Sequence, residues 1–315
     1  MELVLRCTNS RWADCQVHIE NPALGYGAAM LIERYGAQSM VRPLRDVLVK
    51  RPGPAFGAAF DDPAHGFLHQ VDLDRAQREH DAFRLLLESL GVAVHALEAE
   101  TTSPDLVYAY DPMLVTDRGV IALRSGKPNR VGEETALEKW AAAAGIPTLG
   151  RIEAPGTVDG GDTFWLTPDI FCIGRSLRTN RSGAEQLAHL VGGRVEIFDV
   201  PYGNGPDECL HLLSVISPVA EDAAAVYLPL LPSALWELLT EMGIRMIPVP
   251  DEEFASQGCN LLAVRPGVVV MIEGNPRTQA ALEEAGIEVH TFSGREICVN
   301  GSGGPTCLTR PIYRD

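Results

Sequence analysis

The sequence predicts a single α/β domain, built as a closed ring of repeated units with the order strand–strand–helix–strand. The order recurs five times with a period of roughly 50 residues, which is typical of solenoids and closed arrays. The helices are short and have one apolar face, so they should cover layers of strands. An open stack would need polar end caps, and none is found. No linker rich in Ser or Pro divides the pattern.

The predicted elements follow one another in the same order along the chain. The first and least regular unit has a strand at 47–49, a helix at 72–90 that ends at Gly91, and a strand at 92–96. In the second unit, strands are predicted at 106–108, 119–123 and 148–152 and a helix at 133–144, and in the third, strands at 163–166, 170–173 and 195–200 and a helix at 182–191. In the fourth unit, strands are predicted at 210–216, 224–228 and 246–249 and a helix at 233–242. In the fifth, strands are predicted at 261–264, 268–272 and 288–291 and a helix at 277–285. Residues 1–40 show weak periodicity, so we expect an N-terminal extension at 1–40 and one catalytic domain at 41–315.

Composition and charge narrow the class of protein. The hydrophobic content of 46% and the charged content of 22% are those of a soluble globular protein. The net charge of −16 argues against a nucleic-acid partner, because a phosphate backbone needs a basic face. The charge permits a cationic small-molecule substrate, which a negative field attracts, although acidity can also serve solubility alone.

The cysteines and the N-terminus predict a cytoplasmic protein. The seven cysteines are odd in number and irregularly spaced, and no CxxC pair occurs, so neither a zinc site nor a disulfide framework is indicated. The N-terminus lacks the apolar core of a signal peptide, and no apolar run reaches the length of about 18 residues that spans a membrane. We therefore expect free thiols in a reducing cytoplasm and no membrane partner.

Side chains suited to catalysis lie at the ends of the predicted strands. Asp105 and Asp111 flank the segment LVYAY, Asp159 opens the motif DGGD, His211 lies in CLHLLS, and Cys307 follows the glycines of GSGGPTCLT. Each has a simpler explanation, such as a turn, a loop, a hydrogen-bonded core histidine or a buried structural cysteine. If the ring closes, however, these side chains meet in one cavity. A cysteine can then act as the nucleophile and a histidine as the proton shuttle, while carboxylates orient the histidine or bind a guanidinium.

Several stretches, in order along the chain, resemble the guanidino-group-modifying or pentein superfamily, and above all its dimethylarginine dimethylaminohydrolases. They are SPDLVYAYDP, RSGKPNR, EAPGTVDGGD, IGRSLRTNRSGAEQL, LHLLS, QGCNLL and GGPTCLTRP, which run from about residue 103 to 312. Arginine deiminases and amidinotransferases belong to the same superfamily. The resemblance implies a five-bladed α/β propeller of ββαβ units, with pseudo-fivefold symmetry around a central active-site pocket and with neither metal nor cofactor.

The resemblance also implies roles for the catalytic residues. Cys307 matches the nucleophile, and His211 matches the general acid and base. Asp159 matches the carboxylate that orients the histidine and contacts the guanidinium. Asp111 matches the second carboxylate that binds the guanidinium.

Four further positions bear on the substrate. Arg130 and Arg178 match residues that hold the substrate α-carboxylate, and Asp105 matches a residue near its amino-acid end. Tyr110 stands where the resembling hydrolases usually have an acidic residue, and alternation along a strand lets its side chain point either way. We expect the side chain of Tyr110 to point into the active-site pocket, where it would make methylated arginine a better substrate than arginine. The residues that follow the nucleophile, 308–311, look more like those of deiminases or amidinotransferases.

These roles predict a hydrolase that converts an N-omega-methylated arginine to citrulline and an alkylamine through a thiouronium on Cys307. An arginine deiminase or an amidinotransferase would use the same intermediate, and a guanidino-binding protein could share the scaffold. The intact pair of Cys307 and His211 favours an enzyme, because a binding module needs neither residue. The expected partner is a small guanidino compound, and a homodimer is compatible with the resemblance.

Overall fold

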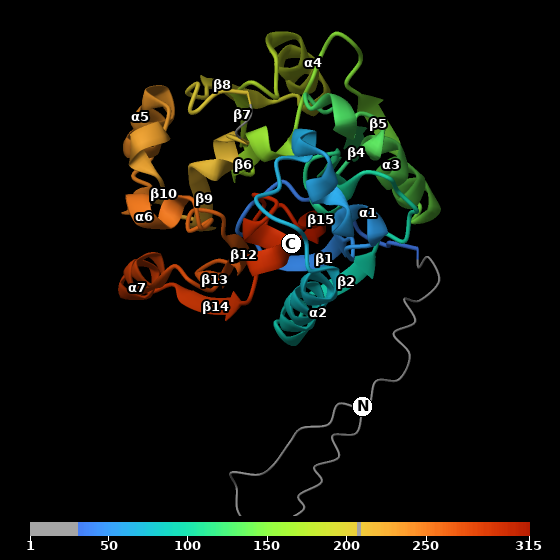
Figure 1. Cartoon of the computed structure of the whole chain (residues 1–315). Helices are drawn as coiled ribbons and strands as arrows, with labels where there is room; N and C mark the ends of the chain where they lie inside the picture. The colour runs from blue at the N-terminus through green and yellow to red at the C-terminus, as the bar shows by residue number, and fades with distance from the viewer. Residues whose placement is uncertain (1–30, 207–208) are drawn as a thin grey trace, which may run out of the picture. The chain divides into compact units, whose positions relative to one another are not determined.

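Five three-stranded sheets carry the architecture of residues 31–206 and 209–315, the part of the chain that the computed structural model describes (Figure 1). Each sheet pairs a central strand with one antiparallel and one parallel neighbour. In order of pairing, the sheets are β15 (Thr309–Arg314), β1 (Leu44–Val49) and β2 (Ala93–Ala96); β3 (Met113–Thr116), β4 (Gly119–Ala122) and β5 (Thr148–Arg151); β6 (Thr163–Thr167), β7 (Ile170–Arg175) and β8 (Arg194–Asp199); β9 (Ile216–Ala220), β10 (Ala223–Val226) and β11 (Arg245–Pro248); and β12 (Leu262–Arg265), β13 (Val268–Ile272) and β14 (Glu288–Phe292).

A helix follows the central strand of each sheet and leads to its parallel neighbour. Parallel strands cannot be joined by a tight turn, so a crossover of this kind is needed. The crossover helices are α2 (Leu73–Ser89), α3 (Glu133–Ala143), α4 (Arg181–Val191), α5 (Ser233–Glu241) and α7 (Pro276–Glu284), and they lie outside the sheets (Figure 1). Shorter elements are α1 (Pro54–Gly57), α6 (Asp251–Phe254), the 3-10 helices η2 (Ala59–Asp61), η3 (Pro63–His65), η4 (Pro104–Val107), η5 (Pro128–Arg130), η6 (Gly160–Asp162), η7 (Leu212–Ser214) and η8 (Leu228–Leu230), and the π-helix η9 (Arg295–Val299).

The first unit is irregular in sequence because its outer strand comes from the other end of the chain. β15 pairs antiparallel with β1, so that Val49 lies opposite Thr309 and Leu48 lies opposite Arg310. The sequence analysis predicted a strand neither at β15 nor at β3. This pairing of distant segments holds the C-terminal end of the chain, and with it Cys307, against the first sheet.

Two of the predicted strands are wrong. Residues 104–107 form the 3-10 helix η4, and the chain passes through η7 at 212–214 before β9 begins at Ile216. Both segments are short, buried and apolar, so their sequence shows neither a helical nor an extended period. Pro104 also favours a helical start, because a first-turn residue has no backbone hydrogen bond to lose. The other predicted strands and helices are confirmed, with ends that differ by at most three residues.

Part of the predicted N-terminal extension lies with the sheets. Residues 31–40 belong to the same compact unit as the rest of the described chain, whereas residues 1–30 lie outside the described residues. The backbone N–H of Ile32 donates to the carbonyl of Ala144 (3.0 Å), and Gly36 forms a bridge with Tyr313 of β15. Met40 is buried in the core. In the described ranges, no helix combines the length and the apolar character needed to cross a bilayer.

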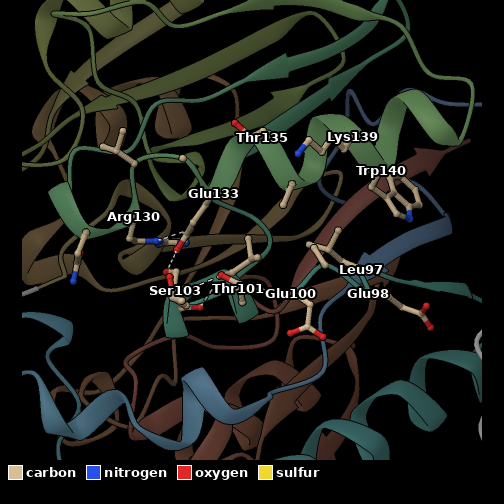
Figure 2. Close-up of a pocket in the computed structure, with 17 residues that line it drawn as sticks. Leu97, Glu98, Glu100, Thr101, Ser103, Arg130, Glu133, Thr135, Lys139 and Trp140 are labelled. Atoms are coloured by element: carbon tan, nitrogen blue, oxygen red, sulfur yellow. Dashed lines mark hydrogen bonds and ion pairs between the residues drawn. The ribbon is translucent and has the colours of Figure 1, made fainter.

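A cavity of about 940 Å³ opens between the segment that follows β2 and helix α3 (Figure 2). Residues 97–103 line one side, and residues from η5 and α3 line the other. Arg130 and Glu133 belong to this lining and form an ion pair (2.8 Å), and the Ser103 hydroxyl donates to the Glu133 carboxylate. Both residues of this pair are buried.

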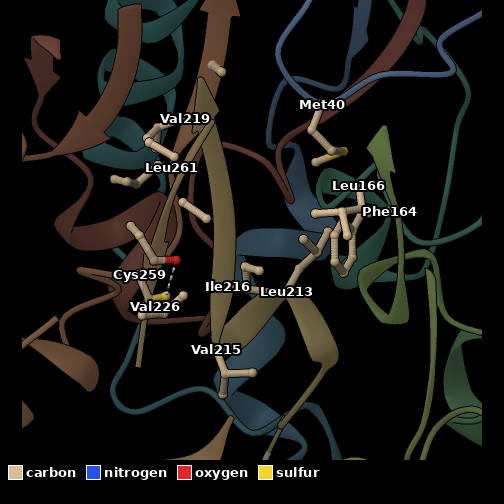
Figure 3. Packing of buried hydrophobic residues seen from close by; sticks show 14 of the residues in the cluster. Met40, Phe164, Leu166, Leu213, Val215, Ile216, Val219, Val226, Cys259 and Leu261 are labelled. Carbon is tan, nitrogen blue, oxygen red and sulfur yellow. Dashed lines mark hydrogen bonds between the residues drawn. The ribbon is translucent and has the colours of Figure 1, made fainter. Parts of the chain in front are cut away.

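One large hydrophobic cluster joins sheets that follow one another along the chain. It contains Phe164 of β6, Ile216 of β9 and Leu261 beside β12, and Met40 packs against them from the N-terminal segment (Figure 3). The sheets are therefore packed against one another through a shared interior. The loops at their strand ends are held in place by that packing.

The outer helix α2 should contribute to stability through Phe83. This side chain is fully buried and stacks on Phe292 with ring centroids 4.7 Å apart. Phe83→Ala should lower the free energy of unfolding by about 3–5 kcal/mol, because it removes buried apolar area and leaves a cavity. Leu85→Ala in the same helix is the control, since Leu85 is 51% exposed and its loss should cost less than about 0.5 kcal/mol. Equal effects in urea unfolding would contradict the packing described.

Candidate active site

Asp159 and His211 form a buried, charged pair. Asp159 has no solvent exposure, and its Oδ2 lies 3.2 Å from Nε2 of His211. The Asp159 Oδ1 accepts hydrogen bonds from the Ser125 hydroxyl (2.7 Å) and from the Gly126 N–H (2.9 Å). Burial acts to raise the pKa of Asp159, but His211 and Arg178 outweigh it and lower that pKa well below its usual value. The carboxylate is therefore ionised and fixes the orientation of the imidazole.

The imidazole of His211 is stabilised in its protonated form. Burial alone would lower the pKa of His211, but Cys209, Asp162 and Asp159 outweigh burial and raise the pKa well above its usual value. Asp159 occupies Nε2, so Nδ1 is the nitrogen left for proton transfer. The Sγ of Cys209 lies 3.7 Å from that Nδ1.

The two glycines of the motif DGGD lie where a side chain would clash with a neighbouring segment. A Cβ on Gly161 would lie 2.4 Å from Nδ1 of His211, and a Cβ on Gly160 would lie 2.2 Å from the carbonyl oxygen of Tyr110. Neither glycine has a positive φ. Both are needed for close approach, and a side chain at either position would push the histidine or the Asp111 segment away.

Asp162, to which the sequence analysis gave no role, holds the turn that carries the histidine. Its Oδ1 accepts the N–H of Leu212 (2.9 Å), and its Oδ2 accepts the hydroxyls of Ser176 (2.6 Å) and Thr179 (2.7 Å). Burial raises the pKa of Asp162 to about 6. In the motif DGGD, Asp159 thus contacts the ring of His211, and Asp162 accepts a hydrogen bond from the backbone of the turn that follows His211.

Asp111 is held by a backbone amide and an arginine. Its Oδ1 accepts the N–H of Gly161 (2.8 Å), and its Oδ2 accepts Nη1 of Arg130 (2.5 Å). Arg130 also donates Nε to Glu133 (2.9 Å) and Nη2 to the carbonyl of Asp105 (3.1 Å), and the residue is only 4% exposed. Arg130, expected at the substrate α-carboxylate, is thus engaged on all three nitrogens with the protein itself.

Asp105 and Arg178 differ in how fully they are paired. The Asp105 carboxylate accepts Nζ of Lys127 (2.7 Å) and lies 3.5 Å from Nδ1 of His65. Arg178 has a side chain only 13% exposed, and its Nη1 lies 3.7 Å from the Asp159 carboxylate. That buried Nη1 has no hydrogen-bond partner within the described residues. Arg178, unlike Arg130, retains a donor for a further group.

Tyr110 is turned into the core and is not brought to the thiol. Its hydroxyl donates to the carbonyl of Thr163 (3.3 Å), and the Arg310 guanidinium stacks 3.8 Å from the centre of its ring. The side chain belongs to the cluster that contains Met40 and Phe164. The segment LVYAY is a 3-10 helix followed by a turn and is not a strand. Its side chains therefore do not alternate between two faces, and the reason for expecting Tyr110 to point into the pocket is removed.

Cys307 is half-buried, and its Sγ accepts a hydrogen bond from Nδ2 of Asn260 (3.2 Å). The Oδ1 of Asn260 accepts the N–H of Thr306 (3.1 Å), so one amide holds both the nucleophile and its neighbour. Burial and the charge of Asp111 raise the pKa of Cys307 to about 11, against the lowering effects of Asn260 and His211. The thiol is therefore protonated at neutral pH in this structure.

The glycines before Cys307 are needed because a side chain at their positions would clash with neighbouring residues. A Cβ on Gly304 would lie 2.4 Å from Cγ of Asn260, and a Cβ on Gly303 would lie 2.4 Å from the ring of Tyr108. Within this run a positive φ is found at Ser302 (59°). The glycines let the nucleophile loop lie directly against Asn260 and Tyr108.

Contacts connect the backbone of Cys307 to the segment that lies against the histidine. The N–H of Tyr110 donates to the carbonyl of Cys307 (3.2 Å), the Asp111 carboxylate accepts the N–H of Gly161, and Gly161 lies against His211. The cavity of Figure 2 includes neither the thiol nor the histidine in its lining, and it reaches this cluster only through Arg130. Among the described residues, no three His, Cys, Asp or Glu side chains are grouped so as to hold a metal ion.

Known proteins match this chain over most of its length. N(G),N(G)-dimethylarginine dimethylaminohydrolase from Pseudomonas aeruginosa is 30% identical over 253 residues, which cover 77% of this chain and 90% of that protein. The chain belongs to the guanidino-group-modifying, or pentein, superfamily. The family model for arginine deiminase matches residues 219–314. Arginine deiminase from Rhodococcus erythropolis is 31% identical over 265 residues, but the match covers only 57% of the deiminase.

Solved structures support the pentein fold. The Pseudomonas aeruginosa enzyme complexed with citrulline has a TM-score of 0.72 at 25% identity, covering 86% of this chain and 100% of that one. The N-terminal domain of an arginine dihydrolase from Cyanobacteria, bound to product, has a TM-score of 0.75 at 19% identity, covering 85% and 97%. A saxitoxin-pathway amidinotransferase from Microseira wollei has a TM-score of 0.71 at 19% identity, covering 89% and 97%. The last two matches show the fold alone.

In this pentein, Asn260 is a further site residue, besides Asp162 and Cys209, that the sequence did not identify. It lies within the stretch QGCNLL, which carried part of the resemblance, but no role was assigned to it. An asparagine among buried apolar residues has no spacing or motif that marks it as functional. Only the return of the C-terminal loop brings Cys307 against it.

Asn260 should control the ionisation of Cys307. Asn260→Asp keeps an oxygen to accept from Thr306 but places a negative charge near Sγ, which raises the pKa of the thiol. Alkylation of Cys307 by iodoacetamide at pH 8, followed by peptide mass spectrometry, should slow by at least about tenfold. Gln279→Glu on the outer helix α7 is the charge-matched control and should alkylate at the wild-type rate. An unchanged rate in Asn260→Asp would show that the amide does not tune the thiol.

Proposed function

We propose that this protein hydrolyses the guanidinium group of an N-omega-methylated arginine to citrulline and an alkylamine. The observation that carries the proposal is the contiguous cluster of Cys307, Asp111, Asp159 and His211, in a member of the superfamily that modifies guanidino groups. Two buried carboxylates beside a thiol and an imidazolium suit a planar cation. A guanidinium bound there would also offset the charge of Asp111 that raises the pKa of Cys307.

The proposed reaction has two halves. When the guanidinium binds, Cys307 releases its proton to solvent. The thiolate then attacks the central carbon of the guanidinium, the bond from that carbon to the substituted nitrogen breaks, and protonated Nδ1 of His211 gives its proton to the departing amine. The product of this half is a thiouronium on Cys307. A water molecule then loses a proton to His211 and attacks the same carbon, and the thiolate leaves. The sum is substrate plus water giving citrulline plus alkylamine.

The choice of a methylated substrate is supported by the extent of the match. The chain covers 90% of the dimethylarginine-hydrolysing relative but 57% of the arginine deiminase. Tyr110 gives no support to this choice, because its hydroxyl bonds to the carbonyl of Thr163 in the core. Hydrolysis of arginine itself is the second candidate, because the family model that matches the nucleophile segment is that of arginine deiminase. An amidinotransferase would differ only in using an amine in place of water.

Three further properties of the protein are proposed with this function: its closed fold, its location and its oligomeric state. We propose that the five sheets close into a propeller around this cluster, within a single catalytic domain at 41–315. The protein would act in the cytoplasm on free small molecules, without metal or cofactor, as a homodimer. Analytical ultracentrifugation of the full chain tests the homodimer directly.

Cys307→Ser should abolish turnover while leaving the fold intact. We expect a loss of kcat on the order of a thousandfold or more, because a serine hydroxyl is a far weaker nucleophile at this position. The measurement is mass spectrometry of citrulline, ammonia and alkylamine after incubation with arginine, monomethylarginine and dimethylarginine. Near-wild-type turnover with an unchanged melting temperature would refute the role of the thiol. Faster turnover of arginine than of both methylated forms would move the assignment to a deiminase.

The unpaired donor of Arg178 should bind the substrate α-carboxylate. Agmatine lacks that carboxylate, so the wild type should turn it over at least about a hundredfold less efficiently, in kcat/KM, than arginine. Arg178→Ala should shrink this difference to about tenfold or less, by lowering kcat/KM for arginine more than for agmatine. Arg181→Ala, which removes an exposed arginine of the same segment, should leave the ratio unchanged. An unchanged ratio in Arg178→Ala would place the carboxylate elsewhere.

A further inference from the structure

Cys209 is a second thiol in the catalytic cluster, and the proposed reaction does not use it. Its Sγ lies 3.7 Å from Nδ1 of His211, a hydrogen-bond distance for sulfur, and the residue is half-buried. A thiol paired with an imidazole is the arrangement that activates cysteine nucleophiles. Cys209 therefore lies beside Nδ1, the nitrogen of His211 that does not face Asp159.

The charges around Cys209 favour its thiolate. Burial acts to raise the pKa of Cys209, but the charges of His211 and Arg178 outweigh both burial and the opposing charge of Asp111, so the pKa is lowered. The other buried thiols differ: burial raises the pKa of Cys259 to about 12, and burial with the charge of Asp111 raises that of Cys307 to about 11. Of these three, Cys209 is the thiol that carries a negative charge most readily.

We propose that Cys209 is a modification site for small neutral electrophiles, hydroperoxides among them, and that its modification switches the enzyme off through His211. The loss of turnover rests on the proposed function, whereas the reactivity of the thiol does not. With a hydroperoxide, the Cys209 thiolate attacks one peroxide oxygen and the O–O bond breaks. The leaving alkoxide or hydroxide takes up a proton to give an alcohol or water. The sulfur is oxidised by two electrons to a sulfenic acid, and the peroxide is reduced by two.

The added atom would act at the nitrogen needed for catalysis. A sulfenate oxygen or an alkyl group on Sγ extends toward Nδ1 of His211, which lies 3.7 Å from the unmodified sulfur. Gly161 lies against the same nitrogen and leaves the ring little room to withdraw. The modified side chain would then hold or cover the proton that the departing amine requires.

The test compares the reactivity of the thiols by residue. The wild-type chain is treated with iodoacetamide at pH 7, and the alkylated cysteines are mapped by peptide mass spectrometry. We expect Cys209 to be labelled at least about tenfold faster than Cys307 and Cys259. His211→Gln should slow the labelling of Cys209 by at least about tenfold, because the imidazolium that stabilises the thiolate is lost. Labelling of Cys307 as fast as Cys209, or no effect of His211→Gln, would overturn the proposal.

The switch is tested with hydrogen peroxide on active protein. Turnover of the wild type should fall in parallel with oxidation of Cys209, and Cys209→Ala should lose its own activity at least about fivefold more slowly. Cys172→Ala, which removes a fully buried thiol of β7, is the matched control and should decay like the wild type. Equal decay of Cys209→Ala and wild type would refute the switch. If no guanidine is turned over at all, the proposed function fails, while the labelling rates still decide the modification site.

Discussion

The site depends on the burial of one ionised carboxylate, Asp159. A charge with no solvent exposure is tolerated only where hydrogen-bond donors replace water. Ser125 and Gly126 supply two donors to one oxygen, and His211 supplies one to the other. These donors come from two separate segments of the chain, at residues 125–126 and at His211, so the requirement to satisfy one carboxylate fixes how those segments meet Asp159. The orientation of the histidine follows from the same requirement, whereas its charge is favoured by Cys209 and Asp162 as well as by Asp159.

A second buried network sets the position of Asp111. Arg130 joins Asp111 to Glu133, and Ser103 donates to Glu133 at the wall of the outer cavity. Burial raises the pKa of Glu133 against the lowering effect of Arg130, so its charge depends on that arginine. A buried arginine that satisfies two carboxylates is a structural group. Its contacts give Asp111 a defined geometry, whereas Arg178 keeps a buried Nη1 that has no hydrogen-bond partner within the described residues.

The two thiols beside His211 have opposite surroundings. Cys307 faces the negative charge of Asp111 and is held by the neutral amide of Asn260, whereas Cys209 faces His211 and Arg178. In this structure Cys307 is therefore the less ionised of the two. A guanidinium cation would reverse the balance at Cys307 by neutralising the nearby carboxylate. In the proposed mechanism, Cys307 would thus be activated only by its cationic substrate, whereas Cys209 would be reactive without substrate.

The sequence by itself determined the repeated unit and the crossover helices, and it supplied the candidate residues Cys307, His211, Asp159 and Asp111, whose catalytic roles remain a prediction. Apolar periodicity and helix-ending glycines are local properties, and motifs such as DGGD and GGPTC are read directly from the chain. Only the tertiary structure decided the roles of Arg130, Tyr110, Asn260 and Cys209, because each depends on segments far apart in sequence. The strand β15 was missed for the same reason, since its partner β1 lies at the other end of the chain. The short runs at η4 and η7 were misread as strands because a buried apolar segment keeps no period that could distinguish a helix from a strand.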